Sequence, residues 1–159
     1  MNPDLRIQRA AAADAQVIAV MAGELLDEIT RAIGSPAFNF KRDAATDTLG
    51  DFIGREKYFV FVATSADTTP AGFITLCESY ALYAEGVFGI VPEFYVRPPF
   101  RSQGVGRRLM DAAKAFGRAR GWKRLEVTTP PLPQFDRTLA FYAREGYSFA
   151  GGRKLKALL

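Results

Sequence analysis

The segment from Val96 to Leu109 constrains the fold more than any other part of the chain. It begins at the end of an apolar run and passes through Pro98 and Pro99, which interrupt both a sheet ladder and a helix. Arg-Ser-Gln-Gly-Val-Gly occupies residues 101–106, and a helical pattern of apolar residues follows at once. A strand, a glycine-rich turn and a helix in this order direct backbone N–H groups and a helix N-terminus at one point. The segment therefore predicts an anion site, most naturally for a phosphate or pyrophosphate.

The composition predicts one folded domain that spans residues 1–159, because 48% of the residues are hydrophobic. No stretch contains the ~20 consecutive apolar residues of a membrane span, and the charged N-terminus does not resemble a signal peptide. We therefore expect a cytoplasmic protein that does not contact a membrane. Cys77 is the single cysteine, which excludes an internal disulfide. The chain has no histidine, so histidine-dependent triads and most zinc sites are excluded, and we expect no metal.

The positive charge of the chain gathers around the glycine-rich turn, although the net charge is only +4. Such a concentration favours a small polyanionic ligand. A nucleic acid is disfavoured as a partner, because no basic recognition helix lies apart from the turn. The basic residues of this cluster are Arg101, Arg107, Arg108, Lys114, Arg118, Arg120, Lys123 and Arg124.

Apolar periodicity predicts the order of strands and helices. Strands are expected over residues 5–9, 58–64, 71–82, 87–96 and 125–128, and helices over 14–33, 43–55, 105–120 and 135–144. Pro92 lies inside the fourth strand and predicts a bulge or a sheet edge there. Gly151 and Gly152 permit a tight turn and predict a C-terminal hairpin. The order predicts an α+β fold with a mixed sheet, antiparallel at first and with a βαβ crossover around the glycine motif.

Several kinds of loop contain the pattern Gly-x-Gly. A dinucleotide fingerprint requires a third glycine, where this chain has Leu109, and a P-loop requires a lysine that the turn lacks. On the two glycines alone, an ordinary strand-to-helix turn that uses glycine for its backbone freedom is an equally good interpretation.

A longer pattern separates these interpretations. Val96, Pro98, Arg101, Gly104 and Gly106, at their spacing, resemble the acetyl-CoA signature of the GCN5-related N-acetyltransferase (GNAT) superfamily. The segment 139–147, with Phe-Tyr ahead of Gly-Tyr, is similar to the second motif of that family. The order of elements resembles the family over essentially the whole chain. The resemblance implies a mostly antiparallel central sheet, splayed between its fourth and fifth strands and flanked by helices.

The resemblance also implies how acetyl-CoA binds. The pantetheine arm would run beside the bulged fourth strand, and the pyrophosphate would lie on the amides of residues 101–106. Either Arg107 or Arg108 would reach the 3′-phosphate, and the N–H of Tyr95 or Val96 would polarise the thioester carbonyl. The implied cofactor-binding residues are Phe94, Tyr95, Val96, Arg101, Ser102, Gln103, Gly104, Val105, Gly106 and Arg107.

Transfer of an acetyl group to an amine requires a neutral amine and a proton for the departing thiolate. A lysine-like amine has a pKa of ~10.4, so only about one in 2,500 is neutral at pH 7, and a base is needed. Glu93 is the first candidate for this base, directly or through water, and Glu78 is the second. The resemblance implies Tyr142 as the acid, although a tyrosine in register with Leu139 also suits a helical core position.

The acceptor is expected to be a primary amine on a small cationic molecule with an apolar portion. The segments that frame the acceptor in this family carry four aromatic and four acidic residues here: Phe38, Phe40, Tyr80, Tyr83, Glu24, Asp27, Glu28 and Glu85. Transfer is expected to be direct, without Cys77 as an acyl carrier. Two alternatives stay open, a peptide or protein N-acetyltransferase and a CoA-binding module without turnover. A homodimer is also open. Phe135 occupies a position where the family often has a cofactor-binding asparagine.

Overall fold

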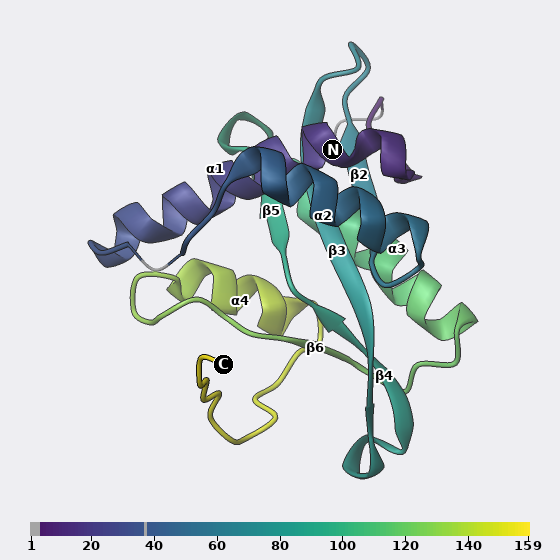
Figure 1. The fold of residues 1–159 in the computed structure, drawn as a ribbon, viewed down its shortest axis with the longest axis vertical. Helices are drawn as coiled ribbons and strands as arrows, with labels where there is room; N and C mark the ends of the chain where they lie inside the picture. The colour runs from purple at the N-terminus through teal and green to yellow at the C-terminus, as the bar shows by residue number, and fades with distance from the viewer. Residues whose placement is uncertain (1–3, 37) are drawn as a thin grey trace.

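The computed structural model describes residues 4–36 and 38–159 and contains one sheet with helices on both faces (Figure 1). The strands are β1 (Arg6–Arg9), β2 (Phe59–Thr64), β3 (Pro70–Ala81), β4 (Gly86–Val91), β5 (Phe94–Val96) and β6 (Leu125–Val127). The helices are α1 (Ala15–Ile33), α2 (Arg42–Gly54), α3 (Val105–Ala119) and α4 (Asp136–Arg144). Short 3₁₀ segments occupy Ala12–Asp14, Leu82–Ala84 and Pro98–Phe100.

The sheet is mixed and mostly antiparallel, as the sequence predicted. Its order is β1-β2-β3-β4-β6, and β5 pairs with β3 beyond the point where β4 leaves it. The pairs that β3 makes with β2, β4 and β5 are all antiparallel, as is the pair β1–β2. The pair β4–β6 is parallel and encloses α3 in the expected βαβ crossover.

Pro92 divides the predicted fourth strand into β4 and β5 through a one-residue bulge. Cys77 faces Ile90 and Ile74 faces Phe94, so β3 advances three residues while the opposite chain advances four. A proline cannot donate to the ladder, and the extra residue absorbs this missing hydrogen bond. The bulge that the sequence predicted is confirmed.

The sheet opens immediately beyond this bulge. β4 pairs with β6 through Gly89–Val91, whereas β5 has only β3 as a strand partner among the described residues. The edge of β5 that faces away from β3 is therefore unpaired within that part of the chain. β4 and β5 together correspond to the fourth strand expected from the family, and β6 corresponds to the fifth. The expected splay between those two strands is therefore the divergence of β5 from β6.

Two apolar clusters fix the helices to the two faces of the sheet. Consecutive residues of β3 point to opposite faces, so Ile74 packs with Leu109 of α3, whereas Phe73 packs with Ile18 and Met21 of α1. The buried face of α1 includes Ile18, Met21 and Ile29, whose spacing is helical. α1 and α2 therefore cover one face, and α3 and α4 cover the other.

A close approach of Trp122 to the sheet was not predicted. A Cβ atom added at Gly89 would overlap the Trp122 ring, and one added at Gly117 would lie 2.8 Å from it. The indole packs edge-to-face against Phe116, with ring centres 5.5 Å apart, and is 7% exposed. Two glycines on separate elements thus leave the space that the indole fills.

The predicted C-terminal hairpin is wrong, because the described residues after α4 contain no strand. Gly151 and Gly152 do adopt positive φ angles of 84° and 72°. However, Phe149 and Leu155 are 78% and 92% exposed, so the flanking residues bury no apolar face. Without such a face, a two-stranded hairpin gains too little stability to form.

Among the described helices, none has the length and apolar character to cross a bilayer.

Candidate active site

The turn between β5 and α3 exposes a set of backbone amides. Ser102 and Gly104 have φ angles of 61° and 80°, which reverse the chain just before the helix. The first bond of α3 runs from the Arg108 N–H to the Gly104 carbonyl at 3.1 Å. The amides of residues 105–107 precede that bond and have no intrahelical acceptor. These N–H groups at a helix N-terminus form a site suited to an anion, as the sequence predicted.

The two glycines of the motif have different environments. Gly104 adopts a left-handed conformation, and a Cβ atom there would meet no described atom within 4 Å. The space above Gly104 is therefore open to a ligand. A Cβ atom at Gly106 would lie 3.4 Å from the Phe94 ring and 3.5 Å from the Phe141 ring. Both are ordinary van der Waals distances, so Gly106 lies directly beside two aromatic rings without the packing alone requiring a glycine there.

The free edge of β5 presents alternate residues. The Thr75 N–H donates to the Glu93 carbonyl, and the Arg97 N–H donates to the Ala71 carbonyl, both at 2.9 Å. Residues 93, 95 and 97 therefore direct their backbone groups toward β3, and Phe94 and Val96 direct theirs to the open edge. Of the two amides expected at the thioester, the Tyr95 amide is used in the ladder. The Val96 amide faces the opening.

Tyr142 lies on α4 beside this opening. Its side chain is 5% exposed, and its ring packs against Phe94 at 6.2 Å and Tyr147 at 5.5 Å. Within the described chain, its hydroxyl makes no hydrogen bond. Every fully buried side-chain oxygen of the described residues does have a hydrogen-bond partner, so the Tyr142 hydroxyl oxygen must be at least partly accessible to solvent. Burial raises the pKa of the Tyr142 phenol, and the neighbouring Tyr147 adds to this effect. The phenol is therefore a protonated donor that faces outward from an aromatic pocket.

Glu93 occupies the bulge and is half-buried. Its carboxylate accepts a short hydrogen bond from the Thr75 hydroxyl, and its N–H donates to the same hydroxyl oxygen at 2.9 Å. Burial raises the pKa of the Glu93 carboxyl, although the bond from Thr75 opposes the shift. A carboxylate with a raised pKa is a stronger base. The sequence analysis did not identify Thr75 as a partner of Glu93. The one sequence signal for such a role is that Thr75 is a polar residue between apolar neighbours in a strand.

Tyr58 and Cys77 lie in the electrostatic field of Glu93. Burial, and after it the charge of Glu93, raises the pKa of both side chains. A thiol with a raised pKa is largely protonated and a weak nucleophile. This environment agrees with the expectation that Cys77 does not carry the acyl group.

The alternative base, Glu78, has a different environment. Its carboxylate accepts hydrogen bonds from Arg120 at 2.7 Å, Trp122 at 3.0 Å and Tyr80 at 3.1 Å. The bond from Arg120, followed by that from Trp122, lowers the pKa of the Glu78 carboxyl. These donors favour the charged form, so Glu78 is a weak base and a structural anion. Between the two carboxylates, the geometry supports Glu93.

Glu93 and Tyr142 lie on opposite faces of the sheet. Tyr95, two residues after Glu93 and on its face, packs in the α1 cluster, whereas Phe94 packs with Tyr142 in the α3 cluster. The two predicted catalytic side chains therefore flank β5, one on each side of its free edge.

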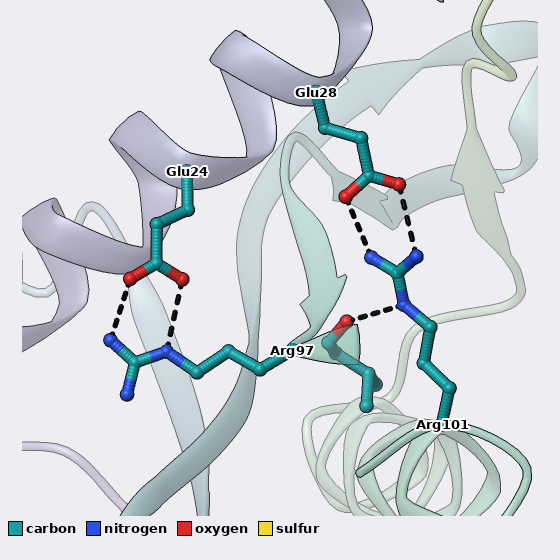
Figure 2. A network of polar contacts seen from close by, with 5 residues as sticks. Glu24, Glu28, Arg97 and Arg101 are labelled. Carbon is teal, nitrogen blue, oxygen red and sulfur yellow. Dashed lines mark hydrogen bonds and ion pairs between the residues drawn. The ribbon is translucent and has the colours of Figure 1, made fainter. Parts of the chain in front are cut away.

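The arginines of the motif region divide into paired and unpaired groups. Figure 2 shows that Arg97 and Arg101 each make a two-pronged ion pair with α1, to Glu24 and Glu28 respectively. Across the described residues, Arg107 and Arg108 make no ion pair. These two guanidinium groups are therefore not engaged by a carboxylate of the described chain, and their expected contact with a phosphate stays a prediction.

The expected acceptor residues are only partly brought together. A groove of about 730 Å³ between α1 and residues 40–44 includes Glu24, Asp27, Phe40 and Asp43. Glu24 is already paired with an arginine, so its charge is compensated. The remaining expected residues do not line this groove. Phe38, Tyr80 and Tyr83 are 47%, 74% and 73% exposed, and Glu28 and Glu85 lie elsewhere.

Within the described residues, no group of three acidic or cysteine side chains is placed to hold a metal ion.

Two known acetyltransferases are similar to parts of the chain. It is 45% identical over 58 residues to N-alpha-acetyltransferase 80 of Mus musculus, a match that covers 36% of this chain and 17% of that protein. It is 36% identical over 95 residues to streptothricin acetyltransferase of Streptomyces lavendulae, covering 57% of this chain and 45% of that protein. The chain thus spans less than half the length of each of these relatives.

Solved structures share the fold over nearly the whole chain. An integron cassette protein from the mobile metagenome of Cole Harbour Salt Marsh has a TM-score of 0.78 at 23% identity, with 99% of this chain and 91% of that chain covered. A GCN5-related N-acetyltransferase from Ralstonia eutropha JMP134 has a TM-score of 0.77 at 18% identity, with 96% and 98% covered. An aminoglycoside acetyltransferase from an uncultured soil metagenomic sample has a TM-score of 0.72 at 19% identity, with 98% and 97% covered.

The sequence model of the acetyltransferase (GNAT) family matches residues 24–147, which include the C-terminal part of α1, the whole of β5, the amide turn and α4. That match contains both motifs singled out in the sequence. The chain belongs to the acetyltransferase (GNAT) family.

Proposed function

We propose that this protein is an acetyl-CoA-dependent N-acetyltransferase that moves the acetyl group directly to a primary amine. The observation that carries the proposal is the convergence of three features at the opening of the sheet. These features are the free edge of β5, the amide turn before α3 and the outward-facing hydroxyl of Tyr142. Each has a chemical counterpart along the length of acetyl-CoA.

The residues present fit CoA at both ends. The amides of residues 105–107 and the open space above Gly104 suit the pyrophosphate, and Arg107 or Arg108 suits the 3′-phosphate. The Phe94 N–H and carbonyl and the Val96 N–H suit the amides of pantetheine, which would extend along β5 as an added strand. In this arrangement the Val96 N–H would donate to the thioester carbonyl and stabilise the negative charge that develops on its oxygen.

Glu93 would remove the proton from the acceptor amine, directly or through a water molecule. Only about one in 2,500 lysine-like amines is neutral at pH 7, so this step has the greater need of catalysis. Tyr142 would donate a proton to the departing sulfur, whose conjugate thiol has a pKa near 8.5. Because the two side chains lie on opposite faces, the amine would approach from the α1 face and the phenol would act from the α4 face.

The acceptor that we propose is a small cationic amine with an apolar portion. The groove beside α1 combines Phe40 with Asp27 and Asp43, and neither aspartate makes an ion pair within the described chain, although Lys41 and Arg42 also line the groove. Relatives that act on such molecules support this choice: one is named for streptothricin, and a structural neighbour is described with sisomicin. A protein N-terminus as the acceptor is the alternative that the mouse relative supports.

The proposal is tested by release of free thiol from acetyl-CoA across a panel of polyamines, aminoglycosides, amino acids and short peptides. We expect thiol release with at least one small amine. We also expect that CoA at a hundredfold excess over its Kd stabilises the fold by about 2.7 kcal/mol. Stabilisation without thiol release for any amine would indicate a CoA-sensing module. Failure to bind CoA at millimolar concentration would exclude both, and reaction only with peptides would overturn the small-molecule acceptor.

A further inference from the structure

The Arg101 side chain, although it belongs to the amide turn, does not point into it. Its Nε–H donates to the Val96 carbonyl at 2.8 Å, and its two terminal nitrogens donate to the Glu28 carboxylate at 3.0 and 2.7 Å (Figure 2). Its guanidinium also lies 5.6 Å from the centre of the Tyr95 ring. Contacts on three sides hold the guanidinium in one orientation, and a carboxylate on α1 supplies the strongest of them.

The bond to Val96 changes what β5 offers to a ligand. Phe94 and Val96 direct their backbone groups to the open edge, which would otherwise present two N–H groups and two carbonyls. Arg101 occupies one of the two carbonyls. The edge is left with the Phe94 N–H, the Phe94 carbonyl and the Val96 N–H. An extended chain that pairs with these groups has fewer ways to align than one that meets all four.

We propose that Arg101, held by Glu28, is a positioning residue that sets the register in which the pantetheine arm pairs with β5. The inference rests on the proposed binding of acetyl-CoA at this edge. By occupying the Val96 carbonyl, the guanidinium prevents the arm from sliding toward the turn. The thioester carbonyl then meets the Val96 N–H. Arg101 therefore acts on the pantetheine portion, and its side chain contributes little to the phosphates.

The Glu24–Arg97 pair provides a matched control. It joins the same helix to the same end of β5 with a shortest contact of 2.7 Å, as does the Glu28–Arg101 pair. Arg97, however, donates its remaining bond to the Pro70 carbonyl on β3, away from the open edge. Loss of this pair should affect the attachment of α1 without affecting the register of a ligand on β5.

The test compares acetyl-CoA with S-acetylpantetheine, which carries the same thioester and lacks the 3′-phosphate nucleotide and the pyrophosphate. With Arg101→Gln, we expect kcat/KM to fall about tenfold for both donors, because a charge-assisted hydrogen bond is lost in each case. The fall should include kcat, since a shifted arm misplaces the thioester. Glu28→Gln should reduce kcat/KM about threefold for both donors, and Arg101→Lys should restore activity only in part, because lysine lacks the planar fork.

A loss confined to acetyl-CoA, with S-acetylpantetheine unaffected, would show that Arg101 acts on the phosphates and would overturn the proposal. Unchanged kinetics in both variants would also overturn it. If Arg101→Gln does not fold, Glu28→Gln decides, because it frees the guanidinium without removing it. Glu24→Gln should lower the melting temperature and leave the Kd of CoA within twofold. A wild-type protein that does not bind CoA would instead overturn the proposed function.

Discussion

The two faces of β5 hold the two candidate catalytic side chains by different means. On the α1 face, Glu93 is held by hydrogen bonds, because Thr75 contacts both its carboxylate and its backbone N–H. On the α4 face, Tyr142 is held by the packing of Phe94, Phe141 and Tyr147 around its ring, and its hydroxyl makes no bond within the described chain. Burial nevertheless raises the pKa of both groups.

This difference matches the demands of the two proposed proton transfers. A base must keep its carboxylate charged and oriented in a half-buried place, and a hydroxyl donor from Thr75 does this. A phenol that serves as an acid must stay protonated with its O–H unoccupied, and an apolar pocket does this. Desolvation strengthens the carboxylate as a base, whereas it keeps the phenol protonated and makes it a weaker acid. The polar contacts around each group distinguish the proposed base from the proposed acid.

The largest effect is expected from Glu93→Gln. It removes the base and keeps the side chain's size, so kcat should fall about 10²-fold, measured as thiol release with a reactive amine. The same variant should be more thermally stable at neutral pH. Because the folded pKa of Glu93 lies above its unfolded value, its contribution to stability is complete at acidic pH and is lost as the pH rises through the folded pKa.

The stability prediction has a clear pH signature. The difference in melting temperature between Glu93→Gln and the wild type should be near zero around pH 4 and should grow as the wild-type carboxyl ionises. A difference that is largest in acid would mean that the folded protein favours the charged form. Glu93 would then resemble Glu78, and its assignment as the base would be wrong.

A smaller effect is expected from Tyr142→Phe. The phenyl ring preserves the contacts with Phe94 and Tyr147, so the melting temperature should stay the same while kcat falls about tenfold. The loss is moderate because a thiolate with a conjugate pKa near 8.5 leaves without much assistance. Tyr142→Leu, which removes the ring, is the control and should also destabilise the fold. An unchanged kcat in Tyr142→Phe would show that water supplies this proton.

The smallest effect on activity is expected from Glu78→Gln, the control for Glu93. Because Glu78 anchors Arg120 and Trp122 on the α3 face, its replacement should cost about 1 kcal/mol of stability, reduced by partial exposure of the pair. Activity should stay within twofold of the wild type. Denaturant unfolding and thiol release measure the two quantities. A hundredfold loss of activity would reverse the assignment of the two carboxylates.

Local sequence signals predicted the elements of the fold and the ligand turn. Pro92 predicted the bulge, because a missing N–H has the same consequence in any sheet. The positive φ of Gly104 and the start of α3 follow from neighbouring residues as well. Each of these features depends on chain geometry within a few positions, and such geometry leaves a pattern that can be read without the fold.

Features that depend on distant residues were not predicted. Glu24–Arg97 and Glu28–Arg101 join residues 73 positions apart, and the sequence had placed both glutamates at the acceptor site. The choice between Glu78 and Glu93 required the strand phase on each side of the bulge. The fit of Trp122 against Gly89 and Gly117 depends on how three elements meet. None of these arrangements produces a periodic signal along the chain.

The paired carboxylates of α1 also affect how an acceptor reaches the protein. Glu24 and Glu28 are each matched by an arginine, so these four side chains carry no net charge. At 0.15 M salt the Debye length is about 8 Å, and a neutral quartet projects little field beyond it. The other charged residues of the groove also balance in sign, and these are Asp27, Asp43, Lys41 and Arg42. A cationic acceptor would therefore meet this face by largely unassisted diffusion. Its association rate should depend only weakly on ionic strength, and discrimination among amines would arise after contact.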